Sequence, residues 1–217
     1  MVATHFGGSL GLSFHSSLST IEFTQPARAL VDMPIGLPNR GKRRCDELAR
    51  ELLGSRRSTI FSIPSRAAVY AGSYTECCDI NFLDQGCKVS KQAWNLIPKI
   101  RELDAFTRAV PTRHEFIAEA HPELAFKALA PNSWPLAPKR SPEGLATRRE
   151  ILSRALNVSV EQIALDFLSK HPKQLDQTDV YDAMSLCAIL VASRGAVSFV
   201  GSEEVDEFGA PLRICIG

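Results

Sequence analysis

The segment Ala29-Leu30-Val31-Asp32-Met33-Pro34-Ile35-Gly36-Leu37-Pro38 runs three apolar residues straight into an aspartate and then into chain-breaking residues. A short apolar run without alternation predicts a strand that is buried on both faces. Proline has no N–H to donate to a sheet, so the strand should end near Asp32. Ligands gather at strand ends in open α/β sheets, which makes Asp32 a candidate functional carboxylate. The alternative is that Asp32 only caps the turn that follows it.

Length and composition describe an ordinary globular chain. Its 217 residues suffice for one large domain or two small ones, and 45% of them are hydrophobic and 23% charged. A net charge of +1 neither demands nor excludes a nucleic-acid partner. No apolar run approaches the roughly 20 residues of a membrane span, and the first residues lack the pattern of a signal peptide. We therefore expect no membrane partner.

The six cysteines show no C-x-x-C spacing, which predicts reduced, mostly buried thiols and a cytoplasmic protein. Zinc binding by Cys77, Cys78 and Cys87 stays open as an alternative, although no matching histidine pair accompanies them.

Hydrophobic periodicity and turn residues predict the remaining elements. A hairpin is expected over 2–14 around Gly7 and Gly8, and further strands over 115–120, 196–200 and 212–216. Ser90 and Ser141 should cap helices, Ser159 should start a capping box, and Pro98 should kink or split its helix. Helices are predicted over 44–53, 74–83, 90–108, 122–129, 142–156, 160–171 and 178–194.

The arrangement around Asp32 occurs a second time. Phe116, Ile117 and Ala118 lead to Glu119, and a proline and a predicted helix follow. Two carboxylates at neighbouring strand ends would repel each other unless a cation lies between them.

Two further acids, Asp179 and Asp182, lie one turn apart at the start of the last predicted helix. Capping and the helix dipole explain Asp179 well. They explain Asp182 less well, because an acid one turn inside a buried helix needs a partner.

Basic residues flank these acids. The run Arg40–Arg44 holds four basic residues, and the loop from Arg56 to Arg66 mixes three arginines with hydroxyl side chains. Lys139 and Arg140 precede the helix predicted at 142. Such side chains hydrogen-bond phosphate, although the 56–66 segment taken by itself is better explained as a solvated surface loop.

Together these motifs resemble a family of predicted nucleases that is catalogued as domain of unknown function family 429. The resemblance spans roughly Val31 to Arg194. It is carried by VDMPIGL (31–37), RSTIF (57–61), QAWNLIPKI (92–100), EAHPE (119–123), KRSPEG (139–144) and DVYDA (179–183).

The resemblance implies a ribonuclease H-like α/β fold, with a mixed sheet flanked by helices. We expect a single domain over 1–217 with helical insertions around 40–110 and 130–172. Members of the family usually open with a strand that carries an aspartate in a glycine-rich segment followed by Gly-Trp. Here Val2–His5 resembles the strand after that segment, so the usual first strand is expected to be missing.

The first hypothesis is divalent-metal-dependent phosphodiester hydrolysis. Hard oxygen ligands suit Mg²⁺ or Mn²⁺, and Asp32, Glu119 and Asp182 would be the ligands. Asp179 would be a ligand or an orienting group, and His121 a proton shuttle or simply a turn residue. The phosphate backbone of the substrate would be held by Arg40, Arg57, Arg66, Lys139 and Arg140.

The second hypothesis is a ribonuclease H-like binding or regulatory module whose catalytic site has decayed, as the missing first acid suggests. A sugar-kinase activity is disfavoured, because no glycine-rich phosphate loop is visible. The sequence leaves open whether the substrate is DNA, RNA or another phosphorylated compound, and it leaves the oligomeric state open.

Overall fold

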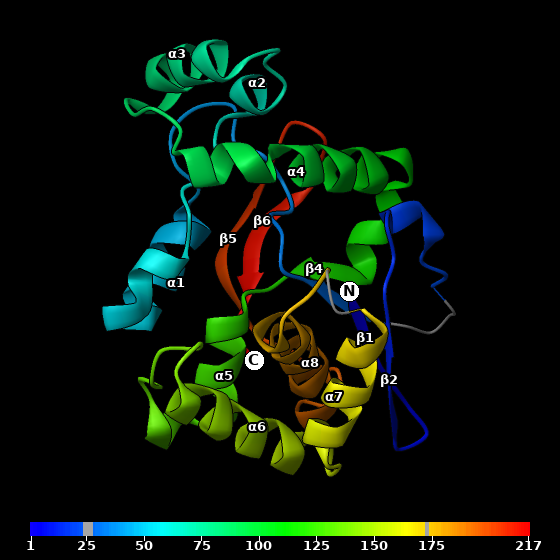
Figure 1. Ribbon diagram of the computed structural model, residues 1–217. Helices are drawn as coiled ribbons and strands as arrows, with labels where there is room; N and C mark the ends of the chain where they lie inside the picture. The colour runs from blue at the N-terminus through cyan, green and yellow to red at the C-terminus, as the bar shows by residue number, and fades with distance from the viewer. Residues whose placement is uncertain (24–27, 172–173) are drawn as a thin grey trace.

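The computed structural model describes residues 1–23, 28–171 and 174–217, and its short strands lie between two groups of helices (Figure 1). Strand β3 (Ala29–Val31) pairs in parallel with β4 (Ile117–Glu119). Strands β5 (Phe199–Val205) and β6 (Pro211–Cys215) form an antiparallel hairpin. A single parallel bridge just after β4 joins the two pairs, so that β4 lies beside β6. The protein is thus a mixed α/β structure with small sheets, as predicted in outline.

The N-terminal hairpin is confirmed. Strand β1 (Val2–Phe6) pairs with β2 (Ser9–Ser13), and Gly7 and Gly8 make the turn with positive φ values of 56° and 84°. The hairpin forms its own two-stranded sheet and packs against helix α8 (Gln177–Ala192). It therefore covers the last helix rather than extending the β3–β4 pair.

Strand β3 lies where the sequence predicts but is less buried than expected. All three of its residues are half-buried. Within the described ranges only β4 pairs with β3, which leaves β3 at an edge where complete burial on both faces is not reached.

The helices form two groups on either side of the strands, with α2, α3 and α4 on one side and α5 to α8 on the other (Figure 1). Short 3₁₀ helices cover Leu18–Thr20 (η1), Gly54–Thr59 (η2), Pro111–Glu115 (η3) and Pro131–Ser133 (η4). No helix in the described ranges is both long and apolar enough to cross a membrane. The other α-helices are α1 (Arg44–Leu53), α2 (Arg66–Val69), α3 (Tyr74–Gln85), α4 (Lys91–Ala109), α5 (Pro122–Leu129), α6 (Pro142–Leu156) and α7 (Val160–Lys170).

Two of the three predicted serine caps are confirmed. Ser90 accepts a hydrogen bond from the backbone N–H of Ala93, and Ser141 accepts one from Gly144. The capping box predicted at Ser159 is wrong, because that side chain makes no capping hydrogen bond. Instead, Ser153 at the end of α6 accepts from the N–H of Val160 at 3.4 Å. Tertiary packing of α6 against α7 supplies the partner that local sequence was expected to supply.

Pro98 does not split its helix, since α4 continues from residue 91 to residue 109. A proline removes one backbone hydrogen bond and crowds the preceding turn. Here Ile97, Ile100 and Leu103 are buried on both sides of the proline, and this packing holds the helix together across the missing bond.

The buried Arg66 joins the α2–α4 group to the strands. Its guanidinium contacts both carboxylate oxygens of Asp104 on α4 at 2.9 Å and also pairs with Asp206 in the β5–β6 turn. Glu207 contacts its Nε at 2.9 Å. Because Arg66 and both aspartates are buried, three elements depend on one compensated charge cluster.

We predict that Arg66→Met destabilises the protein by about 3 kcal/mol, because two carboxylates stay buried without their cation. The free energy of unfolding in urea measures this loss. The control is Arg154→Met, at an exposed arginine on α6 that should stay within about 0.5 kcal/mol of the wild type. Equal unfolding midpoints for the two variants would contradict the predicted role of Arg66.

Candidate functional site

The loop after β3 is fixed tightly against β6. Gly36 has a φ of +78°, and a Cβ at this position would lie 2.6 Å from Cδ2 of Leu212 and 3.1 Å from the carbonyl oxygen of Ala210. Only glycine satisfies both the backbone angle and the space. The loop that follows Asp32 therefore has a defined path.

Glu119, the last residue of β4, is bound by the buried Arg43. Nη2 of Arg43 donates to Oε1 of Glu119 at 2.6 Å, and Nη1 donates to Oε2 at 2.8 Å. The backbone N–H of Ile35 also donates to Oε2 at 2.8 Å. Both carboxylate oxygens of Glu119 thus have strong donors from the protein itself.

Arg43 makes further contacts that fix the surrounding backbone. It donates to Oδ1 of Asp46 from Nε and Nη2, and to the carbonyl oxygens of Ile35 and Gly36 from Nη1. Burial alone would lower the pKa of Arg43, but the carboxylates of Glu119 and Asp46 raise it well above its usual range. The pKa of Glu119 is raised, because its burial outweighs the opposing effects of Arg43 and of the backbone N–H of Ile35.

The carboxylate of Asp182, on α8, forms an ion pair with a lysine. Nζ of Lys139, in the loop between η4 and α6, lies 2.7 Å from Oδ2 of Asp182. The side chain of Asp182 is 16% exposed and that of Lys139 is 43% exposed, so the pair is reached by solvent mainly from the lysine side. Burial raises the pKa of Asp182 and Lys139 opposes this, whereas the hydrogen bond and charge of Asp182 outweigh burial and raise the pKa of Lys139.

Asp32 interacts electrostatically with both Asp182 and Lys139. Its side chain is solvent-exposed, yet the protein around it raises its pKa to about 7, chiefly through desolvation and then through the negative charge of Asp182. Lys139 lowers the pKa of Asp32, and Glu119 raises it further. The structure therefore brings Asp32 and Asp182 within electrostatic range around one ammonium group, although 150 residues separate them in sequence.

Asp179 is a helix cap. Its carboxylate accepts from the backbone N–H of Asp176 at 2.9 Å, and Asp176 in turn accepts from the N–H of Asp179 at 3.1 Å. This reciprocal capping box accounts for the exposed carboxylate, as the helix-dipole alternative anticipated.

His121 caps α5. Its Nδ1 accepts from the N–H of Glu123 at 3.2 Å, which places the proton on Nε2, 3.3 Å from the carbonyl oxygen of Thr59. Burial lowers its pKa to about 4, so the imidazole is neutral at pH 7. These contacts fit the turn-residue interpretation better than a proton shuttle.

The five predicted phosphate-binding residues are placed differently from one another. Lys139 lies at the carboxylates, and Arg40 and Arg57 are exposed. Arg66 is buried in its ion-pair cluster and is not available to a ligand. Arg140 is exposed and lies 3.4 Å from Asp176.

Sequence reasoning missed the buried pairs beneath the site. Arg43 is one of four basic residues in the five positions from Arg40 to Arg44, and nothing in that run marks it as the one that is buried. Glu123 and Arg148 form a second buried pair at 2.7 Å, and both influence the pKa of Asp182. The first-turn position of Glu123 explains its charge by the helix dipole alone, so no sequence signal indicated a partner.

A preformed three-carboxylate metal site is not seen. Among the residues that the structure describes, no group of three or more His, Cys, Asp and Glu side chains is arranged to hold a metal ion. Glu119 is the reason within the predicted set, because its carboxylate is compensated by Arg43. Asp32 and Asp182 remain as oxygen donors.

These features define a mixed α/β protein with an electrostatically coupled carboxylate pair beyond the ends of two parallel strands. The family model described as "Protein of unknown function (DUF429)" matches residues 1–205, so the chain belongs to that family. No curated protein and no solved structure matches the chain.

We predict that the carboxyl group of Asp32 titrates near pH 7 and that Asp182→Asn lowers this pKa, because the variant removes a negative charge. Lys139→Met should raise it. Carboxyl-carbon NMR chemical shifts across the pH range measure both effects.

The sign for stability follows from the same shift. Because the pKa of Asp32 is raised in the folded state, the native protein binds this proton more tightly than the unfolded chain does. The contribution of Asp32 to the free energy of unfolding therefore decreases as the pH rises from about 4 to about 7. Asp179→Asn is the matched control one turn away and should leave the titration of Asp32 unchanged. An Asp32 midpoint near pH 4 in the wild type would contradict this electrostatic picture.

Proposed function

We propose that the protein is a divalent-metal-dependent nuclease of the ribonuclease H-like fold that hydrolyses phosphodiester bonds. The observation that carries the proposal is the convergence of Asp32 and Asp182 on Lys139. The resemblance of its sequence motifs to a family of predicted nucleases leads to the same proposal. Both DNA and RNA fit the proposal, since no described residue at the carboxylates distinguishes the two.

The donor set fits a divalent cation that a substrate helps to bind. Mg²⁺ is commonly held by one or two carboxylates, with water and substrate phosphate oxygens completing its coordination. Asp32 and Asp182 provide two carboxylates, and the Lys139 ammonium shows that a cation is stabilised beside them. A bound Mg²⁺ or Mn²⁺ would supply Lewis-acid activation of water and stabilisation of the leaving oxygen.

The chain's own groups have separate roles in this proposal. Asp32 is reached by solvent and would hold the metal together with Asp182. Lys139 can donate a hydrogen bond to a phosphate oxygen from its exposed side. The Arg43–Glu119 pair positions the loop after Asp32 and does not contact substrate.

The binding-module hypothesis has its own support. The compensation of Glu119 by Arg43 removes one of the three predicted metal ligands. A module of this kind would bind nucleic acid or a protein partner without turnover, and the two candidates differ in whether Mn²⁺ supports cleavage.

We predict that Asp32→Asn lowers Mn²⁺-dependent cleavage of labelled DNA or RNA by about 100-fold or more, because the variant loses a charged metal ligand. Gel analysis of the products, with circular dichroism to verify folding, measures this. Asp166→Asn, at an exposed aspartate on α7, is the control and should cleave like the wild type. Unchanged cleavage by Asp32→Asn would contradict the role given to Asp32, whereas no cleavage by the wild type would favour the binding module.

We also predict that Lys139→Met tightens Mn²⁺ binding roughly two- to fivefold, because a half-exposed ammonium competes with the metal for the same carboxylates. Isothermal titration calorimetry gives the dissociation constant. If binding weakened instead, Lys139 would not be a competing cation, and the two-carboxylate metal site would be refuted.

A further inference from the structure

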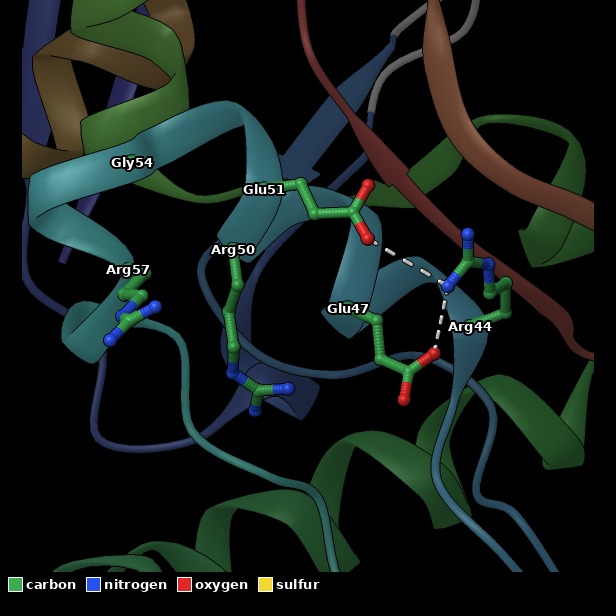
Figure 2. Close-up of a pocket in the computed structure, with 6 residues that line it drawn as sticks. All are labelled: Arg44, Glu47, Arg50, Glu51, Gly54 and Arg57. Atoms are coloured by element: carbon green, nitrogen blue, oxygen red, sulfur yellow. Dashed lines mark hydrogen bonds and ion pairs between the residues drawn. The ribbon is translucent and has the colours of Figure 1, made fainter.

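A second charged surface lies on α1 and η2. A hollow of about 630 Å³ is lined there by Arg44, Glu47, Arg50, Glu51, Gly54 and Arg57 (Figure 2). It is open to solvent, and no aromatic side chain lines it. The three arginines come from one helix and the 3₁₀ turn that continues it, so their backbone positions are fixed relative to one another.

The charges in this hollow are unevenly compensated. Arg44 contacts Glu47 at 3.0 Å and Glu51 at 3.9 Å, so both acids lie at the same arginine. Arg50 donates only to neutral acceptors, the carbonyl oxygen of Ile60 and the hydroxyl of Ser62.

Arg57 is exposed and has no ion pair among the residues that the structure describes. In Figure 2 the guanidinium groups of Arg50 and Arg57 lie on the side of the hollow away from the Arg44 pairs. The half-buried Arg50 and the exposed Arg57 therefore have no ion pair within the part of the chain that the structure describes.

Hydrogen bonds join η2, which lines part of the hollow, to segments beside the carboxylate site. The carbonyl oxygen of Thr59, the last residue of η2, accepts from Nε2 of His121 at 3.3 Å. Arg56 of η2 donates to the carbonyl oxygen of Leu136, in the loop that carries Lys139. The 3₁₀ helix η2, which carries Arg57, is thus held against the segment that follows β4 and against the loop that precedes α6.

We propose that Arg50 and Arg57 bind the phosphodiester backbone of a polynucleotide strand that continues to Lys139 and the carboxylates. This inference rests on the proposed nuclease function and adds the surface that holds the substrate outside the reacting bond. Guanidinium groups pair well with phosphate oxygens. Without an aromatic platform or an enclosing wall, the surface reads the backbone and not the bases, so binding is independent of sequence.

The test is fluorescence anisotropy of a labelled oligonucleotide at low salt with a chelator present, so that binding is measured without turnover. Arg57→Glu should weaken binding about tenfold or more and reduce the slope of log affinity against log salt by about one. Arg154→Glu is the matched control, because it makes the same charge change at an exposed arginine on α6. Equal affinities for the two variants, or no binding by the wild type, would overturn the proposal.

Competition distinguishes a strand from a single phosphate. An unlabelled oligonucleotide should displace the probe, whereas inorganic phosphate at the same phosphate concentration should not. Displacement by inorganic phosphate would overturn the strand and indicate a ligand with one phosphate group.

Asp32→Asn separates this inference from the proposed function. The variant should bind the oligonucleotide like the wild type while losing cleavage. If wild-type protein binds through Arg57 but never cleaves, the nuclease proposal fails and the binding surface stands.

Discussion

The buried guanidinium of Arg43 is the constraint on which the rest of the site depends. It binds the carboxylate that ends β4, the carbonyl groups of the loop after β3, and Asp46 in the first turn of α1. A charge that is 1% exposed must be fully hydrogen-bonded, and satisfying it fixes three separate segments at once. The position of Asp32 follows from this arrangement, because its loop cannot move without breaking those bonds.

The same requirement for charge compensation divides the acids into two kinds. Glu119 is neutralised from within the protein by an arginine that solvent does not reach, so it serves the fold. Asp182 is neutralised by Lys139, whose ammonium group approaches the carboxylate from the solvent side. Lys139 can therefore leave Asp182 for another partner. Asp32 makes no ion pair among the residues that the structure describes, and its pKa is raised chiefly by desolvation and then by the negative charge of Asp182. The chemical role in the proposed function is therefore assigned to the Asp32–Asp182 pair rather than to all the acids near it.

The helices α2 to α4 are joined to this core by an analogous buried cluster around Arg66. Two arginines within one short stretch of sequence thus differ in their burial. Arg66 turns inward to Asp104 and Asp206, whereas Arg57 stays in solvent on η2. A local pattern of arginines and hydroxyls cannot distinguish them, because the partners that bury Arg66 lie 38 and 140 residues further along the chain.

The sequence by itself determined the strand that ends before Asp32, the strand that ends at Glu119, the hairpin, and nearly all the helices with their serine caps. These features depend on local periodicity, on proline and glycine, and on hydrogen bonds within a few residues. Only the tertiary structure decided that Arg43 binds Glu119 and that Lys139 pairs with Asp182. Such pairings depend on which charges are buried together, and burial arises from contacts between distant segments that no local pattern encodes.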